Sequence, residues 1–258
     1  LKVSKAHVLL FALFFVLLAS SRPAEAAALK EKGRVQVSPG VIRQEVQVKV
    51  GGRNHMVDVI QVDLNNPYAS LEVMAGAGTY PRRDTVSNMA DRTDAYAAIN
   101  GDFFNMSKQG APFGPSVVEG KLQSSPLESI GLYAFGIDGN RKAHIESFTF
   151  SGGAYASDGA SYPISGLNKT DYIINHTQVP SHRDSIQLYN DFWTSRSRGL
   201  KGSGEVLLAG NGKVEKISLN GPLPMATPKG KFILQVNGRA KSFIQKHVFY
   251  DAILLTLS

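Results

Sequence analysis

Apolar and polar residues alternate along the first part of the chain with the two-residue period of half-buried β-strands. The alternation covers residues 41–50 (VIRQEVQVKV) and residues 55–63 (HMVDVIQVD), and the Gly51-Gly52 pair between them is a turn signal. After a second turn at Asn65-Asn66-Pro67, residues 69–75 are predicted to form another strand. This part of the chain is therefore expected to be a β-meander.

The hydrophobic period changes at residues 85–95 (TVSNMADRTDA). Val86, Met89 and Ala90 share one face of a helix, and Thr85 is a suitable N-cap residue. The pattern predicts a short helix that leads into residues 96–100 (YAAIN), a predicted buried strand.

Short strand-like segments recur through the rest of the chain. The predicted strands are residues 116–118, 130–137, 143–150, 171–175, 185–189, 204–210, 213–219 and 230–236. Residues 152–166 are rich in Gly, Ser and Ala, which indicates a loop or a weak edge strand. Because the chain has no repeat, heptad pattern or long amphipathic helix, it is expected to be α+β, a strand-rich mixed sheet with one or two short packed helices.

Residues 1–26 have the three regions of a secretory signal peptide. Lys2 and Lys5 give a basic start, residues 8–19 are unbroken apolar sequence, and Ala24-Glu25-Ala26 offers small residues for cleavage. Twelve apolar residues are too few to span a bilayer, which takes roughly 20. We expect cleavage before Ala27, a secreted or cell-surface location, and no membrane span after cleavage.

Composition and charge limit the partners. The chain has no cysteine, which excludes disulfides, thiolate catalysis and thiolate metal sites. Its formal charge of +7 falls to +5 without the three positive charges of Lys2, Lys5 and Arg22 and the one negative charge of Glu25 in residues 1–26. A mildly basic surface suits anionic glycans, wall polymers or phosphates, although a solvated surface without an electrostatic partner explains it equally well. The basic segments lack interleaved aromatic residues, so no nucleic-acid partner is expected. No histidine spacing fits a metal site, so neither a metal nor a cofactor is expected; His176 and His182 are spare site candidates or part of an exposed loop.

The densest group of candidate site residues is the segment AINGDFFN at residues 98–105. The Asn100-Gly101 pair is expected to let the backbone leave the preceding strand through a positive φ. Asp102 would then lie at the carboxyl end of that strand and face a cleft.

Two aromatic residues and a Gly/Pro-rich loop follow Asp102. Phe103 and Phe104 are suited to form the wall of a cleft, and the loop GAPFGP, which ends at Gly114-Pro115, lets backbone N–H groups approach a ligand. The alternative is a tight turn in which both phenylalanines belong to the core and Asp102 is a capping residue.

The stretch AAINGDFFN…GAPFGPSVVEGKLQ resembles the signature of the phosphodiester glycosidase family, the relatives of the mannose-6-phosphate uncovering enzyme. In that family a strand ends in N-G-(G/D)-F-F, and a G-x-P-x-G loop and an acidic-Gly-basic turn follow, here Glu119-Gly120-Lys121. Residues 85–90 resemble the family's preceding helix, and residues 189–193 resemble its Y-x-x-x-W segment. The likeness covers roughly residues 41–245.

The resemblance implies an enzyme that separates a sugar from a phosphate at its anomeric carbon, with a glycan or phosphoglycan as substrate. Such a site needs a carboxylate that acts on the anomeric centre or its attacking water, and donors around the phosphate. The catalytic candidates are Asp102 and Asn100. The substrate-binding candidates are Gly101, Phe103, Phe104, Gly114, Pro115 and Arg83, of which Arg83 follows Arg82 in a pair that fits a phosphate clamp or is merely solvated.

The family's second signature, an arginine-containing strand, a DGR turn and a glycine-rich aspartate loop, does not occur in this sequence. We therefore expect a polar lead-in at residues 27–40, an incomplete and inactive enzyme domain at residues 41–248, and an apolar tail at residues 249–258 that is out of frame or truncated. A genuine terminal strand is the alternative for the tail. For the whole chain the alternatives are a non-catalytic glycan- or cell-wall-binding module and a structural β-rich domain of a surface protein.

Overall fold

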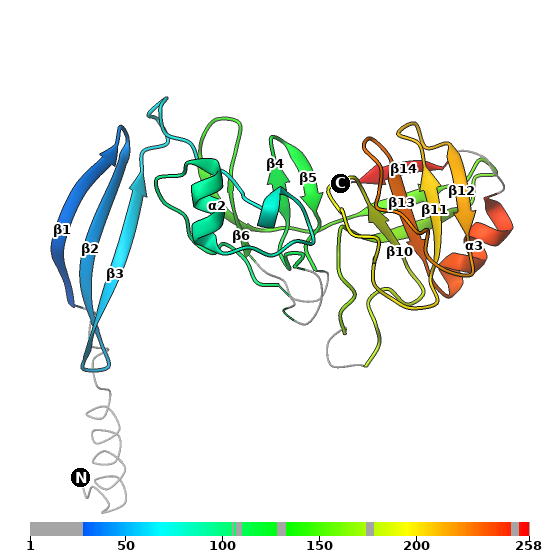
Figure 1. Ribbon diagram of the computed structural model, residues 1–258, viewed down its shortest axis with the longest axis horizontal. Helices are drawn as coiled ribbons and strands as arrows, with labels where there is room; N and C mark the ends of the chain where they lie inside the picture. Colours follow the sequence, from blue (N-terminus) through cyan, green and yellow to red (C-terminus); the bar gives the residue numbers. More distant parts are fainter. Residues whose placement is uncertain are drawn as a thin grey trace, which may run out of the picture. The chain divides into compact units, whose positions relative to one another are not determined.

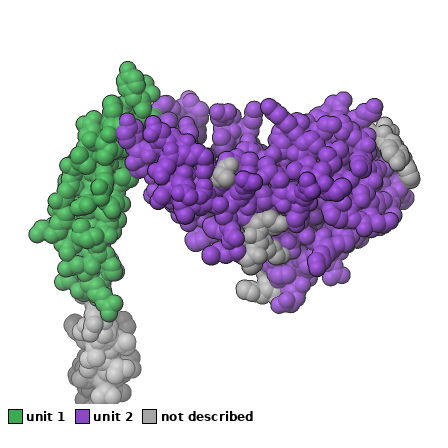
Figure 2. Space-filling model, in the orientation of Figure 1, with its two compact units in different colours: residues 1–69 green, residues 70–258 purple. Residues whose placement is uncertain are grey.

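The computed structural model describes residues 28–104, 106, 110–127, 133–173, 178–248 and 253–257. The chain divides into two compact units, residues 1–69 and residues 70–258 (Figure 2). The sequence predicted one domain over residues 41–248, whereas the division follows residue 69. The predicted signal peptide lies outside the described residues.

Unit 1 (residues 1–69) contains a three-stranded antiparallel sheet in the order β1-β2-β3. Its strands are β1 (Ala28–Ser38), β2 (Val41–Val50) and β3 (Arg53–Val62). The β2–β3 hairpin and its Gly51-Gly52 turn, with φ of 55° and 77°, confirm the sequence prediction.

The predicted lead-in at residues 27–40 is largely a strand instead. A turn with φ of 77° at Gly40 closes a hairpin in which β1 pairs with β2 from Ala28↔Lys49 to Ser38↔Val41. Backbone hydrogen bonds to β2 provide this pairing whatever the side chains are, so the polar composition of the segment concealed it.

The first part of unit 2 (residues 70–258) holds a 3-10 turn, a helix and two hairpins. These are η1 (Gly76–Gly78), α2 (Val86–Thr93), β4 (Ser116–Val118) with β5 (Lys121–Ser124), and β6 (Tyr133–Ile137) with β7 (Ala143–Ser147). Thr85 caps α2 as predicted, because its hydroxyl accepts a hydrogen bond from the Asn88 N–H at 3.1 Å. The strand predicted at residues 69–75 does not form, because those residues pair with no described strand.

The second part of unit 2 is a seven-stranded sheet in the order β12-β11-β13-β10-β9-β8-β14 (Figure 1). Its strands are β8 (Gly152–Tyr155), β9 (Ser161–Leu167), β10 (Ile186–Tyr189), β11 (Gly204–Leu208), β12 (Val214–Ser218), β13 (Phe232–Val236) and β14 (Leu254–Leu257). β9 and β10 run parallel and the other neighbours antiparallel, so the sheet is mixed. With the helices α2 and α3 (Arg239–His247), the predicted α+β, strand-rich fold is confirmed.

Two weak sequence segments are parts of this sheet. Residues 152–166, predicted as a loop or weak edge, contain the interior strands β8 and β9, where a small residue such as Ala154 is fully buried. The expected out-of-frame tail contributes β14, which pairs antiparallel with β8, and Ile253 is 1% exposed in the core. Ile253 is therefore covered by packing, whereas Leu254 of the paired strand is still 67% exposed.

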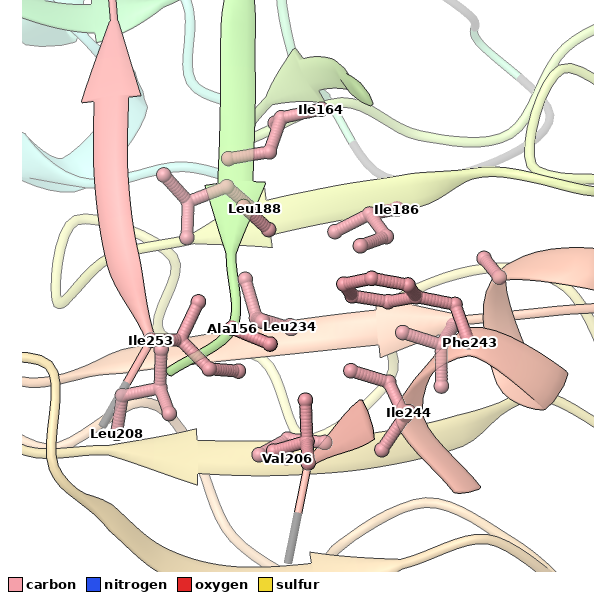
Figure 3. Packing of buried hydrophobic residues seen from close by; sticks show 14 of the residues in the cluster. Ala156, Ile164, Ile186, Leu188, Val206, Leu208, Leu234, Phe243, Ile244 and Ile253 are labelled. Carbon is pink, nitrogen blue, oxygen red and sulfur yellow. The ribbon is translucent and has the colours of Figure 1, made fainter. Parts of the chain in front are cut away.

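One of the two hydrophobic core clusters of unit 2 lies between the sheet and α3, and the other surrounds Tyr80, Tyr189 and Trp193. Phe243 and Ile244 of α3 pack on Val206 and Leu234 from the sheet, together with Ile186 (Figure 3). Ala240, Phe243 and Ile244 have the i, i+3, i+4 spacing of one helical face. The sequence analysis missed α3 because this face occupies only nine residues, too short for a strong periodic signal.

Candidate functional site

Residues 96–104 form an exposed, irregular segment, not the predicted buried strand. The side chains of Tyr96 and Ile99 are 75% and 81% exposed, and no described strand pairs with residues 96–100. Gly101 is not among the residues with positive φ, so the chain does not turn at Asn100-Gly101 in the predicted way. The strand prediction was wrong because a hydrophobic pattern cannot reveal whether a neighbouring strand is present to pair with. The predicted positive φ at Asn100-Gly101 was wrong as well, since it depended on that strand.

The structure nevertheless brings the two motifs of the candidate site together. The Phe113 N–H donates to the Phe103 carbonyl at 2.8 Å, and Phe104 and Pro112 form an antiparallel bridge. Asp102 completes the pairing, because its Oδ2 accepts a hydrogen bond from the Gly114 N–H at 2.8 Å. We call residues 102–104 and 112–114 the Asp102 loop.

The close approach of Asp102 leaves little room for a side chain at position 114, which favours glycine there. A Cβ atom at position 114 would lie 3.0 Å from Asp102 Oδ2, whereas a Cβ at Gly101 would meet nothing within 4 Å. The glycine permits close approach to a carboxylate of the protein itself, and Gly101 has no comparable steric role.

Lys169 lies two residues after the end of β9 and fixes the Asp102 loop through hydrogen bonds from its side chain. Its side-chain ammonium donates to the carbonyl oxygens of Pro112, Phe113 and Gly114 at 2.7, 3.2 and 3.2 Å. Lys169 is 2% exposed, and its three N–H donors match the three acceptors. The sequence analysis did not select Lys169, since a single lysine after an apolar strand carries no motif.

The electrostatics of the loop follow from burial. Burial raises the pKa of Asp102, while the N–H groups of Gly114 and Phe103 and the charge of Lys169 act to lower it. Burial lowers the pKa of Lys169 to about 7, against the opposing effect of Asp102. Burial also raises the pKa of Tyr80, and the negative charge of Asp102 raises it further. The charge of Asp102 thus acts on the pKa values of both Lys169 and Tyr80.

The two aromatic residues of the loop differ in exposure. Phe103 is 71% exposed, which rules out the core position considered for it, and Phe104 is half-buried at its bridge with Pro112. Of the two rings, Phe103 therefore offers the larger exposed aromatic surface in the loop. Pro115, also half-buried, leads from the loop into β4.

Two other candidate site residues, Asn100 and Arg83, lie outside the Asp102 loop. Asn100 is exposed, and its side chain forms no hydrogen bond within the described part of the chain. The Arg83 Nη1 donates to the Met106 carbonyl at 2.8 Å, and a Cβ at Gly110 would overlap Arg83 Cγ. Arg83 thus supports the residues next to the Asp102 loop with its guanidinium.

A buried polar network lies behind Lys169. The Lys169 carbonyl accepts from the Tyr189 hydroxyl at 2.7 Å, and His182 Nε2 lies 2.9 Å from that hydroxyl. His182 is 1% exposed and its Nδ1 is 2.9 Å from the Ser181 hydroxyl, so the expected exposed loop does not include it. His176 lies outside the described residues.

The Glu119-Gly120-Lys121 element is a turn, as expected. It joins β4 to β5, and positive φ angles of 50° at Glu119 and 71° at Gly120 are those of a two-residue hairpin turn.

Across the described ranges, no group of three or more His, Asp or Glu side chains is placed to hold a metal ion. No helix of the described chain is long and apolar enough to cross a membrane.

No protein-family model matches the chain, and no curated protein matches it. The fold is similar to a crystal structure from Burkholderia pseudomallei whose name marks it as a candidate exported protein; the TM-score is 0.69 at 13% identity, over 92% of this chain and 69% of that chain. It is also similar to a hypothetical protein from Synechocystis, with a TM-score of 0.68 at 18% identity, over 91% of this chain and 41% of that chain. At such identities the similarity concerns the fold alone, and the resemblance to phosphodiester glycosidases stays a prediction.

Proposed function

We propose that unit 2 is the sugar-phosphate-recognising part of an exported hydrolase of the phosphodiester glycosidase type. The observation that carries this proposal is a half-buried carboxyl, Asp102, followed in the chain by Phe103, whose side chain is 71% exposed. Carboxylates act on the anomeric carbon in glycoside hydrolysis. An exposed aromatic ring offers the apolar face against which a sugar packs.

The environment of Asp102 suits acid–base chemistry. A pKa raised by burial brings a carboxyl closer to the pH at which it can both hold and release a proton. A phosphate attached at the anomeric carbon leaves readily, so the site has less need of a second acid. Lys169 fixes the three carbonyls of the loop and thereby fixes the Gly114 N–H that orients Asp102.

Export is supported by two independent observations. Residues 1–26 have the order of regions found in signal peptides, and the structurally similar Burkholderia protein bears a name that marks it as a candidate for export. A phosphoglycan or wall polymer is a substrate that a protein meets outside the cytoplasm.

A glycan-binding module is the second candidate, and one contact favours it. Both carboxylate oxygens of Asp102 accept backbone N–H groups, from Phe103 at 2.6 Å and from Gly114 at 2.8 Å. This places Asp102 in a loop-holding role that needs no catalysis.

The test uses the full chain and the methyl diester of glucose 1-phosphate, with binding followed by calorimetry and glucose release by enzymatic assay. We expect binding that is lost in Phe103→Ala and kept in Tyr96→Ala, a matched removal of another exposed ring in the same segment. Glucose release that stops in Asp102→Asn would establish catalysis, and binding without release would establish the binding module. If neither binding nor release is observed, both candidate functions are wrong.

A further inference from the structure

An open pocket of about 540 Å³ lies in unit 2, lined by Thr79, Pro81, Arg82, Thr194 and Ser195. We propose that this pocket binds an oxyanion, a phosphate or sulfate group. The lining supplies three hydroxyls and one guanidinium, and none of the five residues is acidic. A guanidinium forms strong charge-assisted hydrogen bonds with phosphate oxygens, and hydroxyls add further donors.

One isolated β-bridge, between Tyr80 and Trp193, brings together the two chain segments that line the pocket. Tyr80 and Trp193 form a parallel β-bridge, with the Tyr80 N–H donating to the Phe192 carbonyl and the Thr194 N–H donating to the Tyr80 carbonyl. Both rings are buried, so the residues next to them in extended chain point to the other side. The Thr79 and Thr194 hydroxyls are hydrogen-bonded to each other at 3.2 Å, and the Thr194 hydroxyl can also donate to the Tyr80 carbonyl at 3.3 Å. With Thr194 donating to that carbonyl, the Thr79 proton is available to a ligand.

The rim of the pocket is held in place before any ligand arrives. The Ser195 carbonyl accepts from Arg198 Nη1 at 3.1 Å, and the Ser195 hydroxyl accepts from the Ser197 N–H at 3.0 Å. Arg198 is itself fixed by a buried ion pair with Glu205 at 2.8 Å. A site that is already ordered loses less conformational entropy on binding.

Arg82 is the charge that is available for a ligand. Its guanidinium makes no ion pair or hydrogen bond among the described residues, whereas Arg83 donates to Met106. The nearest carboxylate along the chain, Asp84, is paired with Arg92 at 2.8 Å. The two adjacent arginines therefore have different tasks: Arg83 supports the protein, and Arg82 faces the pocket.

None of the five residues that line the pocket belongs to the Asp102 loop, and the lining includes neither Asp102 nor Lys169. A backbone hydrogen bond from the Gly110 N–H to the Pro81 carbonyl, at 3.1 Å, joins the pocket to the segment that leads into the loop. The inference therefore does not depend on Asp102 being catalytic or on the proposed hydrolase function.

The experiment is calorimetric titration of the full chain with inorganic phosphate, with sulfate, and with glucose 1-phosphate at low ionic strength. We expect saturable binding that weakens at least about tenfold in Arg82→Gln, about 1.4 kcal/mol. The matched control is Arg239→Gln, which removes the same charge from an exposed arginine at the start of α3 and should leave binding unchanged. Thr194→Val should weaken binding and Thr194→Ser should retain it.

Comparison of the titrations with inorganic phosphate and glucose 1-phosphate also identifies the source of the anion. Tighter binding of glucose 1-phosphate than of inorganic phosphate, with the same dependence on Arg82, assigns the pocket to a sugar-linked phosphate. Equal affinities assign it to the free ion. The absence of saturable binding, or equal losses in Arg82→Gln and Arg239→Gln, would overturn the proposal.

Discussion

The Asp102 carboxylate and the Gly114 N–H are joined by a hydrogen bond of 2.8 Å, which holds together two motifs that lie 12 residues apart in the chain. The other carboxylate oxygen accepts the Phe103 N–H at 2.6 Å. One side chain therefore satisfies two backbone donors and sets the distance between the aromatic residue and the glycine loop.

Replacing Asp102 by Asn is expected to affect both the loop and the chemistry. An amide has one acceptor oxygen, so one of the two N–H groups would face an NH2 group, and unit 2 should lose about 1 kcal/mol of stability. Where a sugar phosphodiester is turned over, kcat should fall at least ~100-fold. Urea denaturation and initial rates measure the two effects.

Asp191 provides a matched control for this substitution. Among the described residues its carboxylate accepts a single backbone donor, the Gly230 N–H at 3.0 Å, at an exposed position. An asparagine keeps one oxygen for that single donor, so Asp191→Asn should leave stability and turnover close to wild type. Equal effects at the two positions would contradict the double role assigned to Asp102.

Local features of the fold were predictable because their signals lie within a few residues. The Thr85 cap and the Gly51-Gly52 and Glu119-Gly120 turns depend on hydrogen bonds and φ angles of adjacent residues. A capping side chain or a glycine that tolerates positive φ indicates the local conformation without reference to the rest of the fold.

Features that depend on distant partners were not predictable. Lys169 meets its three carbonyl acceptors more than 50 residues earlier in the chain. β14 becomes a strand only because β8 lies beside it, and residues 96–100 fail to become one for want of a neighbour. A sequence pattern records preferences for burial, but the identity of a partner follows from the tertiary fold.

The two glycines of the site should respond differently to a methyl group. Gly114→Ala would bring Cβ to 3.0 Å from Asp102 Oδ2, so the loop must shift and stability should fall by about 1–3 kcal/mol. Gly101→Ala meets nothing within 4 Å at a φ that is not positive, and it should be neutral or slightly stabilising. Thermal melts of the two variants decide the matter, and a neutral Gly114→Ala would show that the close approach is not required.

The stability of the protein should rise with pH above about 7 because of Lys169. Its pKa is lowered by burial from 10.5 to about 7, so between these values the unfolded chain binds more protons than the folded one. The free energy of unfolding then increases with pH, by at most about 1.4 kcal/mol per pH unit for one group. Denaturation at pH 7, 8 and 9 measures the slope below pH 10. Near pH 10 the tyrosines of the unfolded chain begin to ionise, and because burial raises the pKa of Tyr80 and Tyr189 in the folded chain, they act in the opposite direction.

Lys169→Met is the variant that isolates this effect. It removes the titrating group, so its stability should change less between pH 7 and 9 than that of the wild type. Parallel pH profiles for the two proteins would exclude Lys169 as the source of the slope.

Export should remove the first 26 residues. The basic start, the apolar run at residues 8–19 and the Ala24-Glu25-Ala26 site predict that a Sec-competent bacterial host releases a protein beginning at Ala27, within a residue or two. Intact-mass measurement of secreted material tests this, and Ala26→Tyr should block or displace cleavage. Secreted protein that retains residues 1–26 would contradict the prediction.

The buried ion pair between Arg198 and Glu205 should be costly to break from one side. Both side chains are fully buried, and Arg198 also donates to the carbonyls of Leu223 and Met225 at 3.2 and 2.9 Å. Glu205→Gln leaves the guanidinium without its counter-charge in the core, and single replacements of this kind cost about 3–5 kcal/mol. Arg198→Met should cost a similar amount, since Glu205 would remain buried and charged.

The double variant Arg198→Met with Glu205→Leu leaves no unpaired charge, so its stability should exceed that of either single variant. Urea denaturation of the three proteins measures the coupling, and strictly additive losses would mean that the two side chains do not stabilise one another.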